Sequence, residues 1–415
     1  MMLLIHDYAG HPFQVQLSRS LARRGHRVVH AYCGSTVTPR GTLAATAAEE
    51  GRLSIESLDL GEKIAKNSLL RRRSQEARYG QLFERLIDRL SPDLVVSGNT
   101  PSQPQRKAAR FCSRRNIPFV SWVQDIYGVA AQKILRKKLG LPGKLIGNYF
   151  IHLDKQSLRL SDAVVVITED FIPTLRDWGL PTERVRYVPN WAPLDECDMR
   201  PKDNAWSRQH GLQDKLVFLY SGTLGMKHNP GLLLQLAQKV QSRADTRVVV
   251  ISEGAASDWL RQEKERLGLT NLVMLKFQPF EVLPDVFGSA DVLLAILERD
   301  AGAFSVPSKV LTYLCAGRPL LLSVPPENLA ARIVQAQAAG LVVAPEDEEQ
   351  FSDAAVAYLD NAKMRAEFGA NARSYAEEHF DIEAITDRFE SVFELARSSR
   401  RPVADTRAEL ATLST

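Results

Sequence analysis

The chain has 415 residues, of which 45% are hydrophobic and 25% charged, and its formal net charge is +4. These values exclude wholesale disorder and indicate two domains of about 200 residues each, because one hydrophobic core rarely supports so long a chain. The mild charge gives no reason to expect a nucleic-acid partner. No run approaches the roughly 18 apolar residues of a membrane-spanning helix, so we expect a cytoplasmic protein.

The four cysteines, Cys33, Cys112, Cys197 and Cys315, lie far apart in the sequence and include no CxxC pair. This spacing argues against a zinc site and is typical of buried, reduced thiols. We therefore expect no disulfides and no bound metal.

Short β-rich runs alternate with helical segments along the first half of the chain. The runs fall at 2–5, 26–32, 93–98, 118–123 and 163–167, and a helix ending near Gly25 separates the first two. Such alternation is typical of a parallel sheet covered by helices.

The same pattern repeats after the segment 188–203, which is rich in proline and acidic residues. Further β-rich runs fall at 216–222, 246–252, 272–277, 291–297, 319–324 and 340–344, and a helical pattern follows from about 353 to 398. We predict an α/β protein with two doubly wound, Rossmann-like domains, whose ligands bind at the carboxyl ends of strands. We predict a first domain at 1–195 and a second domain at 196–380. A helix at 381–398 would return to the first domain, and a flexible tail would follow at 399–415.

The stretch from Phe304 to Val324 is the strongest local signal in the second half. Ser305 or Ser308 can cap a helix with Pro307 in its first turn, and Gly317 can end it. Lys309 is then misplaced, because a helix N-terminus carries partial positive charge. A bound anion would reverse that, so the segment is either a phosphate site or an ordinary amphipathic helix with an exposed lysine.

Two clusters of basic residues lie in the first half. The earlier comprises Lys63, Lys66, Arg71, Arg72, Arg73 and Arg78, and the later comprises Lys133, Arg136, Lys137, Lys138 and Lys144, interleaved with leucine and isoleucine. This mixture suits an anionic membrane surface, which leaves open a peripheral position on the inner membrane. A solvated surface with no lipid partner is the alternative.

The order of these segments resembles the retaining glycosyltransferases of family 4, which have the GT-B fold. The residues that carry the resemblance are 22–32, 161–168, 185–191, 220–237, 289–297 and 307–321. The Asn190-Trp191 pair and the sequence Pro307-Ser308-Lys309 are similar to a subset that acts in bacterial surface-polysaccharide assembly and includes N-acetyl-fucosamine and fucosyl transferases.

The resemblance implies a donor site in the second domain. Gly222 and Gly225 would let the backbone approach a nucleoside diphosphate, and Lys227 and Lys309 would neutralise it as it leaves. Thr223 stands where relatives carry an arginine, and Phe304 and Thr312 stand where many carry glutamates; Glu298 is the nearest substitute acid. Ser305, Ser308 and Thr312 would therefore contact the donor beside Lys309.

The resemblance also implies contacts to the nucleobase and to the acceptor. Glu253, Phe277 and Pro279 would lie near the base, although Phe277 can instead belong to the core. In the first domain, Gly10 and His11 would border the acceptor; His11 can instead be structural or merely exposed.

Asp125 would assist the acceptor hydroxyl, unless it caps a helix. A histidine that some relatives carry near 97–100 is absent.

The implied activity is transfer of a hexose from a nucleoside diphosphate sugar to a polyprenyl-diphosphate-linked or other glycan acceptor, without metal or other cofactor. The first domain would bind the acceptor and the second the nucleotide sugar. A nucleotide-sugar epimerase of the same fold and a non-catalytic nucleotide-sugar-binding subunit are the alternatives.

Overall fold

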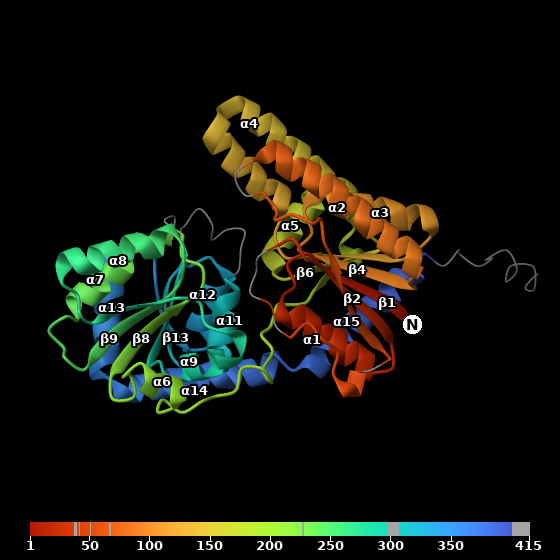
Figure 1. Ribbon diagram of the computed structural model, residues 1–415. Coiled ribbons are helices and arrows are strands. Elements are labelled where there is room, and N and C mark those ends of the chain that lie inside the picture. The colour runs from red at the N-terminus through yellow and green to blue at the C-terminus, as the bar shows by residue number, and fades with distance from the viewer. Residues whose placement is uncertain are drawn as a thin grey trace, which may run out of the picture. The chain divides into compact units, whose positions relative to one another are not determined.

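The structure is a computed structural model that describes residues 1–36, 40, 42–49, 51–65, 68–225, 228–297 and 307–400. The chain divides into two compact units (Figure 1). One is residues 1–189 together with the segment from Ile382, and the other is residues 190–381. Each is a parallel sheet with helices on both faces, so the predicted α/β class with two doubly wound domains is confirmed.

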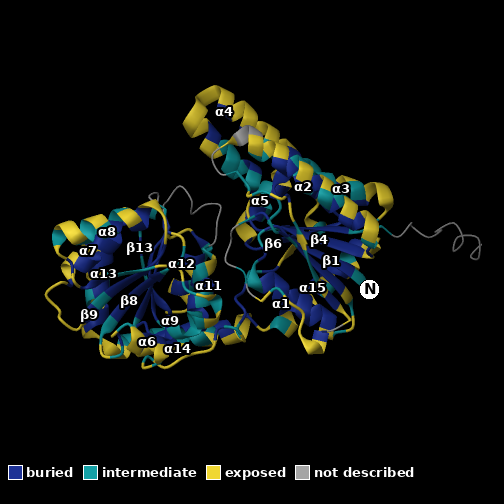
Figure 2. Cartoon of the chain, viewed as in Figure 1, coloured by how far each residue is buried: buried dark blue, intermediate teal, exposed yellow. Residues whose placement is uncertain are grey.

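The first unit is built on a seven-stranded sheet with the order β3-β2-β1-β4-β5-β6-β7. Its strands are β1 (Met2–Asp7), β2 (Arg27–Cys33), β3 (Leu53–Leu58), β4 (Leu94–Gly98), β5 (Phe119–Val123), β6 (Ala163–Val166) and β7 (Val185–Tyr187). Its helices are α1 (Pro12–Arg23), α2 (Leu69–Leu90), α3 (Ser102–Arg115), α4 (Tyr127–Leu160), α5 (Ile172–Asp177) and α15 (Ile382–Ser398). The central strands are buried on both sides, as their continuous apolar runs require (Figure 2).

The second unit is built on a six-stranded sheet with the order β10-β9-β8-β11-β12-β13. Its strands are β8 (Leu216–Ser221), β9 (Thr246–Ile251), β10 (Leu272–Leu275), β11 (Val292–Ile296), β12 (Leu320–Ser323) and β13 (Gly340–Val343). Its helices are α6 (Ala205–Gln209), α7 (Gly231–Lys239), α8 (Ala255–Leu267), α9 (Leu283–Gly288), α11 (Ser308–Cys315), α12 (Leu329–Ala336), α13 (Glu348–Asp360) and α14 (Ala362–His379).

Each sheet has one point where the strand order reverses. In the first unit β1 lies between β2 and β4, and in the second β8 lies between β9 and β11. Helices on either side of such a point diverge, which opens a crevice at the carboxyl ends of the two strands. Asp7 pairs in register with Gly98 at the first of these points, so the topology directs attention to the residues just beyond β1 and β8.

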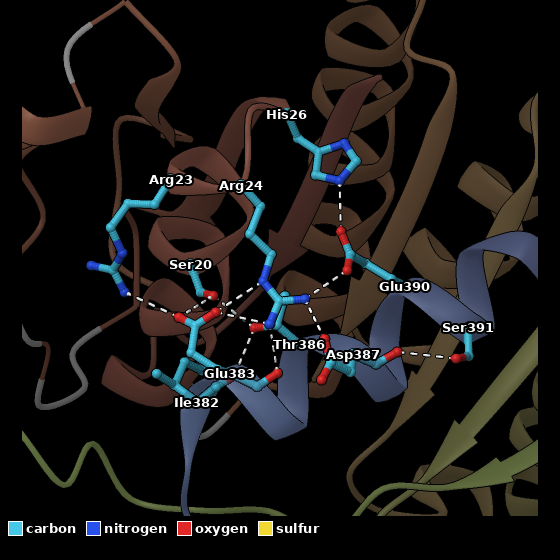
Figure 3. Close-up of polar contacts among 10 residues, drawn as sticks. All are labelled: Ser20, Arg23, Arg24, His26, Ile382, Glu383, Thr386, Asp387, Glu390 and Ser391. Atoms are coloured by element: carbon cyan, nitrogen blue, oxygen red, sulfur yellow. Dashed lines mark hydrogen bonds and ion pairs between the residues drawn. The ribbon is translucent and has the colours of Figure 1, made fainter.

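Helix α15 packs against α1 in the first unit through a cluster of charges (Figure 3). The Arg24 guanidinium, at the end of α1, donates to Glu383 at 2.9 Å and to Glu390 at 2.7 Å. Glu390 also contacts the His26 ring at 2.9 Å, and the Ser20 hydroxyl donates to Glu383 at 3.0 Å. Partly buried, multidentate pairs of this kind fix one element against another more firmly than single surface ion pairs do.

Some expectations about individual elements need correction. Strands β3 and β7 are additional to the predicted runs, and the helical pattern that precedes the separately predicted helix at 381–398 is two helices that break at Asn361. Helix α15 occupies the place of that separate helix. Of the tail, residues 401–415 lie outside the described residues. All four cysteines are buried free thiols. Within the described ranges, no helix is long and apolar enough to cross a membrane.

Candidate active site

The carboxylate of Asp7 anchors a cluster of polar groups at the carboxyl end of β1. Asp7 is fully buried. Its Oδ1 accepts hydrogen bonds from the Ala9 backbone N–H and from Asn99 Nδ2, both at 3.0 Å, and its Oδ2 accepts one from the His11 backbone N–H. A buried carboxylate needs several such donors, and the turn after β1 supplies two of them. Gly10 allows that turn by adopting a left-handed φ of 76°.

The charges of this cluster stabilise one another. Burial by itself would raise the pKa of Asp7, but the His11 charge and the hydrogen bonds from His11 and Asn99 outweigh it and hold that pKa at about 2. Burial would likewise lower the pKa of His11, yet the Asp7 carboxylate and, less strongly, Asp125 raise it. The His11 Nδ1 lies 3.4 Å from Asp7 Oδ2. An ionised pair with one half-exposed face is therefore available beside the strand ends.

Asp125 follows β5 and lies within electrostatic range of His11. Helix α4 begins at Tyr127 with Ile126 at its N-cap and no side-chain cap, so the helix-cap interpretation of Asp125 is wrong. Surrounding protein raises the pKa of the Asp125 carboxyl and the His11 charge opposes that rise. Because the side chain is exposed, solvent moderates the shift.

A cavity of about 130 Å³ lies next to Asp125 in the first unit. Its wall is mostly apolar, with Trp122, Leu158 and Leu175 among its residues. Four polar side chains also line it: Asn99 just after β4, Gln105 on α3, Ser121 on β5 and Asp154 on α4. The structure thus brings Gly10, His11 and Asp125 to one edge of the first sheet, next to a hollow that can accept a hydroxylated ligand.

In the second unit, Lys309 projects toward the end of β8. Its Nζ lies 3.8 Å from the centre of the Tyr220 ring, and a Cβ on Gly222 would lie only 3.1 Å from the same atom. Gly222 has a φ of 125°, which side chains rarely adopt. The Tyr313 hydroxyl fixes α11 to this strand end, because it accepts from Ser221 N–H at 3.0 Å and donates to the Ser221 carbonyl at 3.1 Å.

The Lys309 ammonium lacks a hydrogen-bond partner among the described residues although its Nζ is buried. Burial lowers the pKa of this amine from 10.5 to about 7. Helix α11 has no side-chain cap and no acidic residue in its first turn. Free backbone N–H groups and a buried lysine at one helix end are the groups from which an anion site can be built. The alternative of an ordinary exposed lysine is wrong, because the amine is buried.

The helix containing Lys309 differs in detail from the sequence expectation. It starts at Ser308, with Pro307 at the N-cap and no capping hydroxyl, so the cap predicted at Ser308 is wrong. Ser308 is exposed and Thr312, one turn later, is half-buried. Gly317 ends the helix with a φ of 63°, as predicted. Lys227, Ser305, Glu298 and Phe304 lie outside the described residues.

The remaining predicted donor residues lie at the carboxyl ends of neighbouring strands. The Gly225 backbone N–H donates to the His228 ring at 3.0 Å. Glu253 is exposed beside Gly254, which precedes α8. Phe277 is 46% exposed, so its assignment to the core is wrong. It stands near the exposed Pro279, and no hydrogen bond between described residues joins Glu253, Phe277 or Pro279 to Lys309.

Sequence reasoning missed the groups that hold the predicted residues in place. Asp7 and Asn99 organise the turn that carries His11. Tyr220 contacts Lys309, and Tyr313 fixes the helix that carries Lys309 to the end of β8. A charged residue at the end of an otherwise apolar strand was the available signal for Asp7. The two tyrosines carried no such signal, because aromatic residues in a strand and in an amphipathic helix are ordinary core residues.

Two family profiles match the chain. Residues 11–191 match the family described as "Glycosyl transferase 4-like domain", and residues 202–375 match "Glycosyl transferases group 1". Among curated proteins, the putative glycosyltransferase YtcC of Bacillus subtilis is 22% identical over 46% of this chain and 47% of its own length. The alpha-D-kanosaminyltransferase of Streptomyces kanamyceticus is 21% identical over 58% of this chain and 62% of its own length. The chain thus spans about half to three fifths of these relatives.

Solved structures give the same architecture. HepE of Anabaena, crystallised with UDP-glucose, has a TM-score of 0.68 at 14% identity and covers 95% of this chain and 99% of its own. WaaG, described as a glycosyltransferase involved in lipopolysaccharide biosynthesis, has a TM-score of 0.67 at 15% identity, with the same coverage. At these identities the likeness establishes the GT-B fold and nothing further. Because the two family matches together span most of the chain, it belongs to the group 1 glycosyltransferases with a 4-like amino-terminal domain.

Proposed function

We propose that the chain transfers a hexose, with retention, from a nucleoside diphosphate sugar to a hydroxyl of a lipid-linked glycan. In this reaction the bond between the sugar C1 and the diphosphate oxygen breaks, and a bond between C1 and the acceptor oxygen forms on the same face. The acceptor proton passes to the departing phosphate. No metal or other cofactor is needed in this scheme, because lysines and backbone N–H groups balance the phosphate charge.

The observation that carries the donor half of the proposal is the buried ammonium of Lys309 at the start of α11, which contacts the Tyr220 ring but has no hydrogen-bond partner among the described residues. Burying a cation without a partner is unfavourable, so such a group indicates a site that an anion completes. Gly222 lets a diphosphate approach the end of β8 closely, and Lys227 would add a second cation. Ser305, Ser308 and Thr312 would contact the same group, with Gly225 in the adjoining turn.

The nucleotide would extend from this site toward the ends of β9 and β10. The exposed ring of Phe277, together with Pro279, offers an apolar platform for a base, and Glu253 offers an acceptor for ribose hydroxyls. HepE binds UDP and UDP-glucose, which makes a uridine nucleotide the first donor to test. In this assignment the second unit is the nucleotide-sugar domain.

The first unit would hold the acceptor. Gly10 and His11 border the cluster around Asp7, and Asp125 adjoins the cavity. A carboxylate with a raised pKa can orient or deprotonate a hydroxyl near neutral pH.

The protein would be cytoplasmic and would meet its lipid-linked acceptor at the anionic inner-membrane surface. The basic, leucine-rich segment in α4 would bind that surface close to the acceptor site. The Asn190-Trp191 pair and Pro307-Ser308-Lys309 support a role in surface-polysaccharide assembly, in the subset that includes fucosyl transferases.

Two other functions share this fold: a nucleotide-sugar epimerase, and a subunit that binds the nucleotide sugar without reacting. One experiment separates the three. Purified protein is incubated with UDP- and GDP-sugars, with and without a lipid-linked acceptor, and donor binding is measured in parallel. We expect acceptor-dependent transfer that Lys309→Met abolishes and that Lys363→Met, which removes an exposed lysine on α14 of the same unit, leaves unchanged.

The alternatives give different results. Conversion of the donor without acceptor would identify an epimerase. Lys309-dependent binding without any turnover would identify a binding subunit, and either result would refute the transferase proposal.

A further inference from the structure

Helix α4 is a helical hairpin rather than one continuous helix. Gly140 interrupts it with non-helical backbone angles, which separates an arm that starts at Tyr127 from an arm that ends at Leu160. With a rise of about 1.5 Å per residue, the first arm extends about 18 Å from its base. Figure 1 shows the two arms side by side, reaching beyond the helices of the first unit.

Three glycines let the backbones of the two arms touch. A Cβ added to Gly143 would lie 2.0 Å from the Leu135 carbonyl oxygen, one added to Gly147 would lie 2.4 Å from Gln132 Cα, and one added to Gly128 would lie 2.7 Å from Ile151 N. These contacts leave no room for side chains between the arms. At the base, the Gly128 N–H donates to Asp154 Oδ2 at 2.6 Å. The two arms therefore form a close-packed projection, and of the leucines and isoleucines between residues 134 and 146 only Leu135 is buried.

The apolar residues of the hairpin face solvent instead. Of the nine large hydrophobic side chains that are exposed in the described part of the chain, six lie on α4. Leu141 is 78% exposed, Leu145 71% and Leu139 48%, and all three flank the turn at Gly140. Figure 2 shows the exposed surface running along both arms to the tip. Such a concentration on one element indicates a binding surface rather than scattered surface residues.

Away from its base, the hairpin carries charge of one sign. Residues 127–153 contain five lysines and arginines and no acidic residue; the acidic residue of α4, Asp154, lies at the base. Arg136, Lys138 and Lys144 surround the tip leucines, are exposed, and have no ion-pair partner among the described residues. The other basic cluster is different, because Glu62 pairs with Arg71 at 2.6 Å and with Arg78 at 2.9 Å. Among the side chains that the structure describes in the two clusters, those on the hairpin combine charges without an ion-pair partner with exposed leucines.

We propose that the α4 hairpin docks the protein on an anionic lipid bilayer by inserting Leu139, Leu141 and Leu145 among the acyl chains, while Arg136, Lys138 and Lys144 contact the headgroups. A bilayer fits better than a nucleic acid, because exposed leucines at the tip gain nothing from a phosphate backbone but lose their contact with water in a membrane. Tyr149, 38% exposed further along the second arm, suits the interfacial region.

The position of the hairpin relative to the cavity also concerns how the acceptor reaches its site. Asp125, Tyr127 and Asp154 line the cavity at the base of the hairpin, while the tip lies about 18 Å away. A hairpin held in the interface would keep this cavity near headgroup depth, where a lipid-linked glycan is presented. The inference extends the proposed function by naming the element that meets the lipid. Its test uses no donor or acceptor, so failure of either proposal leaves the other standing.

The test measures sedimentation of the full chain with vesicles of phosphatidylcholine alone or mixed with phosphatidylglycerol. Each basic residue near an anionic surface contributes about fivefold in binding, so the triple variant R136E/K138E/K144E should bind the anionic vesicles at least about a hundredfold more weakly. The matched control R85E/R110E/R114E makes the same change of net charge at exposed positions of α2 and α3 and should bind like the wild type. Equal binding by both triple variants would overturn the proposal.

Insertion is tested separately from attraction. L141S/L145S keeps every charge and should also lose most binding, and a Leu141→Trp variant should show quenching by brominated lipid beyond that of the five native tryptophans. Unchanged binding of L141S/L145S, or no added quenching, would refute insertion. Self-association of lipid-free protein that disappears in L141S/L145S would assign the surface to a second copy of the chain and overturn the membrane proposal.

Discussion

Replacing Lys309 by methionine should stabilise the unliganded protein and weaken nucleotide binding at the same time. Burial lowers the pKa of this amine from 10.5 to about 7. At about 1.4 kcal/mol per pKa unit, keeping the ammonium charged at pH 7 costs about 4 kcal/mol if it is fully desolvated. The side chain as a whole is only partly buried, so we expect about half of that. Methionine has a similar length, can pack on the Tyr220 ring and needs no solvation.

The pH dependence of this stability change follows from the direction in which the Lys309 pKa is shifted. Because the folded-state pKa lies below that of the unfolded chain, Lys309 destabilises the fold most at or below pH 7, and the effect vanishes as the pH rises toward 10.5. The gain from Lys309→Met, about 2 kcal/mol at pH 7, should therefore shrink over that range. UDP binding should weaken at least about tenfold, because a charge-assisted hydrogen bond is lost.

Thermal unfolding and calorimetric titration with UDP measure the two effects on the same samples. Lys363→Met is the matched control and should change neither quantity. A variant that is less stable than the wild type, or one that binds UDP as tightly, would show that Lys309 is an ordinary packed residue and not an anion site.

Three further predictions concern the same two strand ends. UDP affinity should fall by up to about tenfold per pH unit above pH 7, because the neutral Lys309 amine must take up a proton on binding. Calorimetric titration at pH 8 in buffers of different ionisation enthalpy should detect that proton. An affinity that does not change with pH would contradict the prediction. Asp7→Asn should destabilise the first unit by about 2 kcal/mol at pH 7, because a carboxylate whose pKa is lowered to about 2 stabilises the fold above about pH 4. Chemical denaturation should show the difference in unfolding free energy between wild type and variant shrinking as the pH falls from about 4 to about 2. A difference that stays constant would show that the Asp7 charge is not its cause. Gly222→Ala should lower the unfolding free energy by about 1 to 2 kcal/mol, because alanine is strained at a φ of 125°. The added Cβ should also displace Lys309 Nζ and weaken UDP binding. Unfolding and calorimetric titration measure the two effects, and a variant with wild-type UDP affinity would show that the ligand does not need the close approach to Gly222.

The fold could be predicted from the sequence because its signals are local and repeated. Apolar runs such as 163–167 and 216–222 are buried on both faces of a parallel sheet, and residues of that kind in a row have few other uses. Strands β3 and β7 escaped notice because they lie toward the sheet edges and carry exposed or polar residues. Asn361, which divides the last helical pattern, caps α14 by accepting from the Met364 N–H, a role that hydrophobic spacing does not reveal.

The site could be predicted only in part, because its properties depend on distant pairs. Lys309 was identifiable as a misplaced charge at a helix start. The burial that lowers its pKa depends on Tyr220, which is far away in the sequence. Asp7 and Asn99 meet because β1 pairs with β4, and no spacing within either segment encodes that contact. The positive charge of the two basic clusters could be predicted from the sequence. Which cluster is neutralised by ion pairs could not, because that depends on the contacts of Glu62 with Arg71 and Arg78.

The stereochemistry of the product tests the central claim most directly. The wild-type chain would be incubated with a UDP- or GDP-sugar and a lipid-linked acceptor, and the anomeric configuration of the new linkage would be read by proton NMR before any rearrangement. We predict a product with the configuration of the donor, formed by the wild type and by Lys363→Met but not by Lys309→Met. An inverted product, or a linkage formed equally well by Lys309→Met, would contradict a retaining transfer that depends on the diphosphate site at α11.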